Sequence, residues 1–293
     1  MSTLAGQSCI ITGASRGLGA AIARHFWLAG ARLLLVARSK EALERLVQEL
    51  GACADHPCNA EGVPHFLSCD LADPGAPARI ADEAHRRLGG VRVLVNNAAL
   101  QGPIGPAWEN DWAEWERAFR VNFLSPVDLC RRVVPMMGGA GGKIINISGG
   151  GATGPRPGFT AYGSAKSALV RFSETLAMET RTLGIDVNCV APGAMSSAMT
   201  EEVLAAGPLR AGEREYRDAE RIRQQQASPA ERAAALCLYL ASSASDGITG
   251  KLISAVWDPW DALADHLDDL RRTDVFTLRR IVPADRGLGW GTK

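Results

Sequence analysis

The sequence lacks the features of a membrane protein, an exported protein or a nucleic-acid-binding protein. No apolar run approaches the roughly 20 residues that span a bilayer. The first residues lack a charged stretch followed by an apolar one, so we expect no export signal. The 32 basic and 32 acidic residues leave no net charge to attract nucleic acid or anionic lipid. We therefore expect a cytoplasmic protein that binds neither nucleic acid nor membranes.

The cysteines form no disulfide framework. Seven is an odd number without regular spacing, which is typical of a reducing compartment. Cys53, His56, Cys58, His65 and Cys69 offer potential zinc ligands. Their spacing matches no standard zinc module, and Cys69 ends a predicted strand. We therefore predict no metal site.

The chain shows no internal linker. Hydrophobic residues make up 46% of its 293 residues, and apolar runs recur almost to residue 256. We predict one domain over residues 1–256, a dinucleotide-binding catalytic domain on the motifs described below, and a C-terminal extension over 257–293. The extension should pack on the domain or on an oligomer interface, because it contains tryptophans and a helical pattern of Leu263, Leu267 and Leu270.

Short apolar runs alternate with longer amphipathic stretches. The predicted strands are Ser8–Thr12, Arg32–Ala37, Pro64–Cys69, Arg92–Val95, Lys143–Ser148, Asp186–Val190 and Leu252–Ala255. The predicted helices are Gly17–Ala29, Lys40–Leu50, Pro77–Leu88, Asp111–Met137, Thr160–Leu183 and Pro229–Ala241. Strands that are apolar throughout are covered on both faces. The alternation therefore predicts an α/β fold, a doubly wound parallel sheet of the Rossmann type, with ligands beyond the carboxyl ends of the strands.

A glycine-rich turn follows the first predicted strand. It runs from Gly13 through Gly17 to Gly19, and a helix follows. Glycines let the backbone approach a pyrophosphate closely, and a helix N-terminus favours its negative charge. A purely structural turn would use glycine as well, but the strand before and the helix after the turn favour a dinucleotide site.

Several motifs together resemble the short-chain dehydrogenase/reductase family over roughly residues 5–256. They are the glycine turn, Asn96-Asn97-Ala98-Ala99, Asn122, Ser148, Tyr162-x-x-x-Lys166 and Pro192-Gly193. The resemblance implies an enzyme that moves a hydride between a nicotinamide and a carbonyl/alcohol pair. It also implies the cofactor-binding residues, which are Gly13, Ser15, Arg16, Gly17, Leu18, Gly19, Arg38, Asp70, Leu71, Asn97, Ala98, Tyr162, Lys166, Pro192, Gly193 and Ser197.

Charge after the second strand favours NADP(H) over NAD(H). An NAD-preferring site places a carboxylate there to accept from the ribose hydroxyls. This chain has Ala37, Arg38 and Ser39 instead. The guanidinium groups of Arg38 and Arg16 suit a 2′-phosphate, because their donors form a planar fork. The alternative is that Arg38 is only a surface residue at the start of the next helix.

Tyr162 and Lys166 lie four residues apart on a predicted helix, so they share one face. A nearby ammonium should lower the pKa of a phenol from its usual value near 10. The resemblance implies that Tyr162 exchanges the proton with the substrate oxygen and that Lys166 holds the nicotinamide ribose. It also implies that Asn122 anchors a water that links Lys166 to solvent.

The resemblance makes Ser148 the catalytic hydroxyl, donating to the substrate oxygen, although its spacing is unusual. Thirteen residues separate it from Tyr162, one more than the family pattern, and Gly149 stands at the usual position. Thr153 is the second candidate.

The segment Met195–Ala227 should form a flap over the substrate. Its arginines, and Arg156 near the mouth of the site, could bind an anionic substrate group, although a solvated helix face is the alternative. By resemblance we expect a homodimer or homotetramer through the helices 111–137 and 160–183.

We predict a ketone reductase for a small-molecule substrate, 3-oxoacyl-like or sugar-derived. The alternative function is a non-catalytic NADP(H)-binding sensor or scaffold.

Overall fold

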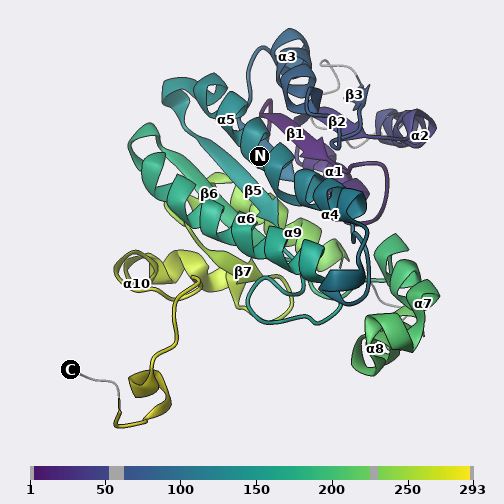
Figure 1. Cartoon of the computed structure of the whole chain (residues 1–293). Helices are drawn as coiled ribbons and strands as arrows, with labels where there is room; N and C mark the ends of the chain where they lie inside the picture. The colour runs from purple at the N-terminus through teal and green to yellow at the C-terminus, as the bar shows by residue number, and fades with distance from the viewer. Residues whose placement is uncertain (1–2, 53–62, 225–229, 291–293) are drawn as a thin grey trace.

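In a computed structural model, which describes residues 3–52, 63–224 and 230–290, a seven-stranded parallel sheet forms the centre of the protein (Figure 1). The strands run in the order β3-β2-β1-β4-β5-β6-β7. Their bounds are β1 Ser8–Thr12, β2 Arg32–Ala37, β3 His65–Ser68, β4 Val93–Asn96, β5 Gly142–Ile147, β6 Ile185–Ala191 and β7 Leu252–Ser254. The α/β fold and the parallel sheet are therefore confirmed, with each predicted strand within two residues of its observed bounds.

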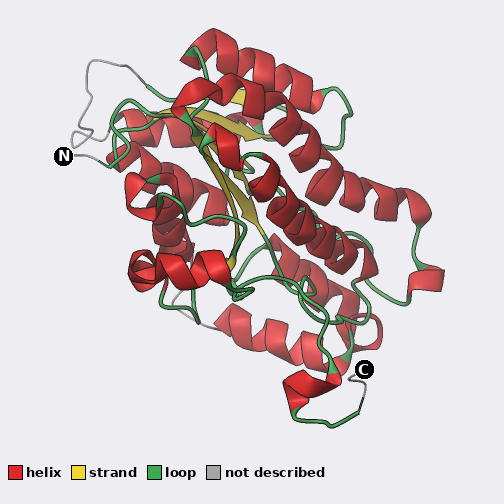
Figure 2. Ribbon diagram, turned by 90° about the vertical axis from the view of Figure 1, so that its left-hand side faces the viewer, coloured by secondary structure: helices red, strands yellow, loops and turns green. Residues whose placement is uncertain are grey.

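Helices cover both faces of the sheet, so that the strands are buried between two layers (Figure 2). One layer contains α1 Gly17–Leu28, α2 Lys40–Gly51 and α9 Ala230–Ala241. The opposite layer contains α3 Ala76–Leu88, α4 Trp112–Phe119, α5 Ser125–Met137 and α6 Thr160–Glu179. Beyond the sheet, α7 Ala198–Ala211 and α8 Glu213–Gln224 occupy the predicted flap, and α10 Leu267–Arg272 lies in the C-terminal extension.

The helix predicted over Asp111–Met137 is not continuous. The π-helical turn Arg120–Leu124 separates α4 from α5. Such a turn adds one residue to the local helical repeat and often occurs at functional sites. Periodicity did not reveal it, because the apolar pattern continues on both sides of the turn. It carries Asn122, which is fully buried.

The C-terminal extension packs on its own chain, beside the sheet edge formed by β7. Leu263 and Leu270 are buried in the core on the α9 side of the sheet. The chain then returns along β7, where the Leu252 N–H donates to the Phe276 carbonyl at 2.8 Å. Trp257 and Trp290 of the extension are 84% and 68% exposed in the single chain, so the packing of the extension on an oligomer interface stays a prediction.

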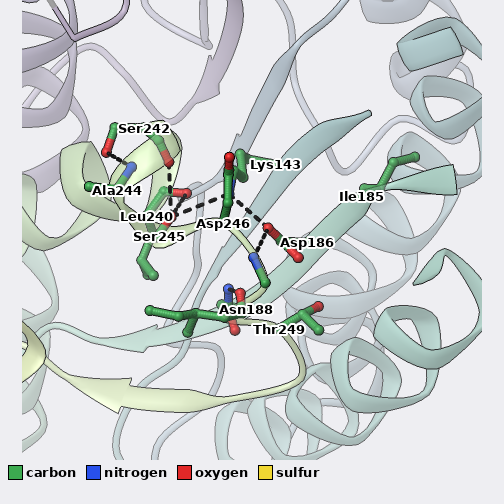
Figure 3. Close-up of polar contacts among 12 residues, drawn as sticks. Lys143, Ile185, Asp186, Asn188, Leu240, Ser242, Ala244, Ser245, Asp246 and Thr249 are labelled. Carbon is green, nitrogen blue, oxygen red and sulfur yellow. Dashed lines mark hydrogen bonds and ion pairs between the residues drawn. The ribbon is translucent and has the colours of Figure 1, made fainter. Parts of the chain in front are cut away.

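A buried ionic cluster lies at the opposite end of β5 and β6 from their carboxyl ends (Figure 3). Lys143 is 4% exposed, and its Nζ lies 2.7 Å from carboxylate oxygens of both Asp186 and Asp246. Its Nζ also donates to the Ser245 hydroxyl at 3.4 Å. Two carboxylates and a hydroxyl thus replace the water that this ammonium loses on burial, which is what a buried charge requires.

Two further observations concern membranes and metals. In the part of the chain that the structure describes, no helix is both long and apolar enough to cross a membrane. Within the same ranges no three potential metal ligands lie together. Cys53, His56 and Cys58 lie outside the described residues.

Candidate active site

A cavity of about 960 Å³ opens at the carboxyl ends of the parallel strands. Its wall includes residues that follow β1, β2, β3, β4, β5 and β6, together with the start of α7. The cavity contains these predicted site residues: Gly13, Ser15, Arg16, Gly17, Leu18, Gly19, Arg38, Asp70, Leu71, Asn97, Ala98, Ser148, Tyr162, Lys166, Pro192 and Ser197. The fold therefore brings together residues that are as much as 184 positions apart in the chain.

The glycine turn is braced from β4. Asn97 Nδ2 donates to the carbonyls of Thr12 and Gly13 at 3.0 and 3.2 Å. The Thr12 hydroxyl accepts from the backbone N–H groups of Asn97 and Ala98 at 3.0 and 3.1 Å. A Cβ on Gly13 or Gly19 would clash with these same groups. A Cβ is therefore excluded at Gly13 and Gly19, which leaves bare backbone at the N-terminus of α1. A helix N-terminus of this kind favours an anionic group such as a pyrophosphate.

Two arginines mark one end of the cavity. Arg16 and Arg38 both line it, and Ser39 caps α2 by accepting from the Ala42 N–H at 3.2 Å. Glu202 of α7 lies near both arginines, a neighbour that sequence reasoning missed. Burial raises the pKa of Glu202, and the positive charges of Arg16 and Arg38 oppose that rise. The two guanidinium groups make this end of the cavity suited to an anionic group. Such a group would compete with the Glu202 carboxylate for the two arginines.

Asp70 is held at the cavity edge by two hydrogen bonds. Its Oδ1 accepts from the Ala72 N–H at 2.9 Å, and its Oδ2 accepts from Arg117 at 3.1 Å. These bonds hold Asp70 at the cavity wall, next to Leu71, which also lines it.

Ser148, Tyr162 and Lys166 occupy the other end of the cavity, and all three are buried. They are 2%, 7% and 1% exposed. Lys166 Nζ donates to the Ile147 carbonyl at 2.7 Å and lies 5.7 Å from the centre of the Tyr162 ring. The Ser148 hydroxyl is shielded from solvent and has no hydrogen-bond partner among the described residues. Thr153, the second candidate, is exposed and does not line the cavity.

Burial dominates the acid–base properties of this end. It lowers the pKa of Lys166 from 10.5 to about 8. It raises the pKa of Tyr162, and the nearby charge of Arg156 opposes the rise. The expectation that the pKa of Tyr162 would be lowered is therefore wrong in direction, because the loss of water around the phenol outweighs the effect of nearby positive charge.

Arg156, in the loop between β5 and α6, contacts both that loop and α8 of the flap. Its guanidinium stacks 3.9 Å from the centre of the Phe159 ring and donates to Glu215 of α8 at 2.8 and 3.0 Å. Two arginines of α8 pair along their own helix, Arg217 with Glu213 at 3.1 Å and Arg221 with Asp218 at 2.8 Å. The solvated-face interpretation therefore fits α8. Arg156 lies 6.0 Å from the centre of the Tyr162 ring but is not in the cavity wall, and its role in binding an anionic substrate group stays a prediction.

Two predicted site residues and the described part of the C-terminal extension lie outside the wall of the cavity. Gly193 and Asn122 are not in the cavity wall. Asn122 uses its side-chain amide to bind the backbone of Leu100, accepting at 3.2 Å and donating at 2.7 Å. The described part of the C-terminal extension contributes no residue to the wall.

The fold and the cavity define a dinucleotide-binding oxidoreductase, and comparisons with known proteins identify its family. The profile of the family described as short chain dehydrogenase matches residues 7–207. The chain is 37% identical over 220 residues to nodulation protein G of Rhizobium sp. (strain N33), which covers 72% of this chain and 85% of that protein. It is 32% identical over 244 residues to the L-fucose dehydrogenase of Oryctolagus cuniculus, covering 82% and 81%.

A solved structure agrees in fold. The carveol dehydrogenase of Mycobacterium avium, solved in complex with NAD, has a TM-score of 0.73 at 21% identity and covers 87% of this chain and 97% of its own. The chain belongs to the short-chain dehydrogenase/reductase family. It is an oxidoreductase that acts on an alcohol/carbonyl pair with NAD(P).

Proposed function

We propose that the enzyme is an NADP(H)-dependent ketone reductase in which Tyr162 supplies the proton. The observation that carries this proposal is the burial of Tyr162, Ser148 and Lys166 at one end of a cavity that has Arg16 and Arg38 at the other. The distribution separates a chemical end from an anion-binding end, as a bound dinucleotide requires. The reduced nicotinamide would supply the hydride to the substrate carbon.

Reduction requires a protonated Tyr162, and burial raises the pKa of this phenol. At neutral pH the phenol is protonated, so it is a hydrogen-bond donor that can protonate a developing alkoxide. Ser148 is the second donor, and its hydroxyl has no protein partner to give up. Donors aimed at the oxygen where charge develops stabilise the transition state, typically by about 3 kcal/mol each. Lys166 would hold the ribose and keep positive charge near Tyr162.

The preference for NADP(H) follows from charge. No carboxylate follows β2, whereas Arg38 and Arg16 line the same end of the cavity. We expect Arg38→Ala to lower kcat/KM for NADPH by about 10- to 100-fold, since a charge-assisted pair with phosphate contributes about 1.5–3 kcal/mol. NADH should change little. Arg86→Ala, at an exposed arginine of α3, is the matched control. Equal turnover with NADH in the wild type would contradict the preference.

The test of the reaction is Tyr162→Phe. NADPH oxidation is measured with a panel of ketones and aldehydes, and NADPH binding is measured in parallel. We expect turnover to be lost by about 100-fold or more while binding persists, because general acid catalysis contributes about 10²–10⁴-fold. Tyr216→Phe on α8, outside the cavity wall, is the matched control. Turnover retained in Tyr162→Phe would refute the role, and binding without any turnover in the wild type would favour the sensor.

We also propose a cytoplasmic homodimer or homotetramer. Support for self-association comes from large apolar side chains exposed on and beside α4 and α6: Trp108 at 86%, Trp112 at 65% and Met178 at 80%. Trp108 and Trp112 lie just before and at the start of a helix predicted for the interface, and exposed apolar surface is typical of interfaces. Support for a reducing compartment comes from the described cysteines, which are free and buried. Equilibrium sedimentation at micromolar concentration tests the assembly, and a monomeric mass would contradict it.

A further inference from the structure

Gln101 lies in the cavity wall and has a buried amide that the protein does not satisfy. The residue follows β4, lines the same cavity as Tyr162 and Ser148, and is 3% exposed. Its Nε2 is shielded from solvent and has no hydrogen-bond partner in the part of the chain that the structure describes. Leaving such a group unpaired costs about 1–3 kcal/mol. Because Gln101 lines the cavity, a bound ligand is the group that could satisfy its amide.

The backbone on both sides of Gln101 is held in place. The buried Asn122 side chain binds both the N–H and the carbonyl of Leu100. On the other side, Gly102 has a φ of +73°, and a Cβ there would clash with Ala118 of α4 and lie 3.4 Å from the Cβ of Ala161. Gln101 is therefore presented to the cavity from a rigid segment that packs against the first turn of α6, next to Tyr162. Such preorganisation is what a substrate-orienting group requires.

The geometry points to Gln101 as a specificity-determining residue that donates a hydrogen bond to a second oxygen of the substrate. This inference rests on the proposed ketone reduction, in which Ser148 and Tyr162 bind the reacting oxygen. A carboxamide offers two donors and an acceptor, and a simple alkyl ketone whose only oxygen is bound by Ser148 and Tyr162 has no second polar group to pair with them. A hydroxyketone or an oxo-ester carries an additional oxygen near the carbonyl and can pair with it. A site with a buried polar group rejects the analogue that leaves that group unpaired.

The experiment measures binding, so that it does not depend on turnover. Ketones without a hydroxyl group cannot give a hydride to NADP⁺, so their Kd values can be measured on the NADP⁺-saturated full-length protein by calorimetry. Two matched pairs serve as probes: methoxyacetone with 2-pentanone, and ethyl acetoacetate with 2-heptanone. The proteins are the wild type, Gln101→Leu and Gln48→Leu, the last an exposed glutamine on α2 outside the cavity wall.

We expect the wild type to bind the oxygen-rich member of at least one pair more tightly. Gln101→Leu should raise the Kd of that member about tenfold and change the alkyl ketone by less than about twofold, as for the loss of one hydrogen bond. Gln48→Leu should match the wild type. Because Nε2 has no protein partner, the melting temperature of Gln101→Leu without cofactor should not fall. These results together support the inference.

Two results would overturn the inference. One is a wild type that does not distinguish the members of either pair, or a Gln101→Leu variant that changes both members of each pair alike. The other is a fall of several degrees in the melting temperature of Gln101→Leu with weaker binding of all probes, which would assign the amide a structural role. Wild-type NADPH oxidation separates the two proposals. Selective binding without turnover leaves Gln101 as a ligand-binding residue and refutes the ketone reductase, whereas turnover that is insensitive to Gln101 refutes only this inference.

Discussion

Lys166→Met should stabilise the folded protein at neutral pH although it removes a proposed catalytic group. Lys166 is 1% exposed, and burial lowers its pKa from 10.5 to about 8. At pH 7 the amine is charged in the folded and the unfolded chain. Because one pKa unit corresponds to about 1.4 kcal/mol, the folded protein holds this charge at a cost of about 3 kcal/mol. Its hydrogen bond to the Ile147 carbonyl offsets about 1–2 kcal/mol. We expect a net gain of about 1–2 kcal/mol in the variant.

The sign of the pH dependence distinguishes this reasoning from a general packing effect. Between pH 8 and pH 10.5 the folded protein releases the Lys166 proton while the unfolded chain retains it. The unfolded state then binds more protons, so the free energy of unfolding of the wild type rises with pH. The rise from pH 7 to pH 9.5 should be about 2 kcal/mol. Lys166→Met lacks this contribution, so its advantage at pH 7 should disappear at pH 9.5.

The assay is urea unfolding of both proteins, without added cofactor, at the two pH values. Other titrating groups are shared, so they cancel in the difference between variant and wild type. Lys40→Met, at an exposed lysine at the start of α2, should follow the wild type within about 0.5 kcal/mol at both pH values. A difference that is the same at pH 7 and pH 9.5, or a variant that is clearly less stable at pH 7, would refute the burial argument.

Three further predictions concern the rest of the molecule. Gly149→Ala should lower kcat more than tenfold in a folded protein, because the new Cβ would displace the Tyr162 hydroxyl; unchanged kcat with normal circular dichroism would contradict this. Asp186→Asn should lower the free energy of urea unfolding by about 3 kcal/mol, since Lys143 loses its buried partner; a loss under 1 kcal/mol would show that Asp246 suffices. Leu270→Ala should cost about 2–5 kcal/mol in the same assay, and no change would mean that the C-terminal extension does not stabilise the domain.

Strand positions and the cofactor end could be predicted because local pattern determines them. β1 and β2 have their predicted bounds, since strands covered on both faces are apolar from end to end. The glycine turn was recognisable because its backbone lies too close to neighbouring groups for a side chain. Glycine is therefore required there and can be seen in the sequence. Arg16 and Arg38 follow strands whose carboxyl ends meet at the same edge, so their common location followed from topology.

Other features depend on distant contacts and left no local signal. The π-helical turn carries Asn122, which binds the backbone of Leu100, and the apolar period continues through it. The pKa of Tyr162 depends on how completely water is excluded, which residue spacing does not report. A glutamine after a strand carries no signal in the sequence, and Gln101 is distinguished only by a buried amide without a partner among the described residues, in the wall of the cavity.

The sequence by itself determined the order of strands and helices, the glycine turn, and the residue types at both ends of the cavity. These follow from short-range patterns of apolar residues and from backbone conformations that few residues allow. Only the tertiary structure decided where the C-terminal extension packs, which groups remain unpaired in the cavity, and in which direction burial moves the pKa values of Tyr162 and Lys166. Those properties depend on solvent exclusion by segments far apart in the chain, and the free energy of removing a polar group from water is set by the whole of its surroundings.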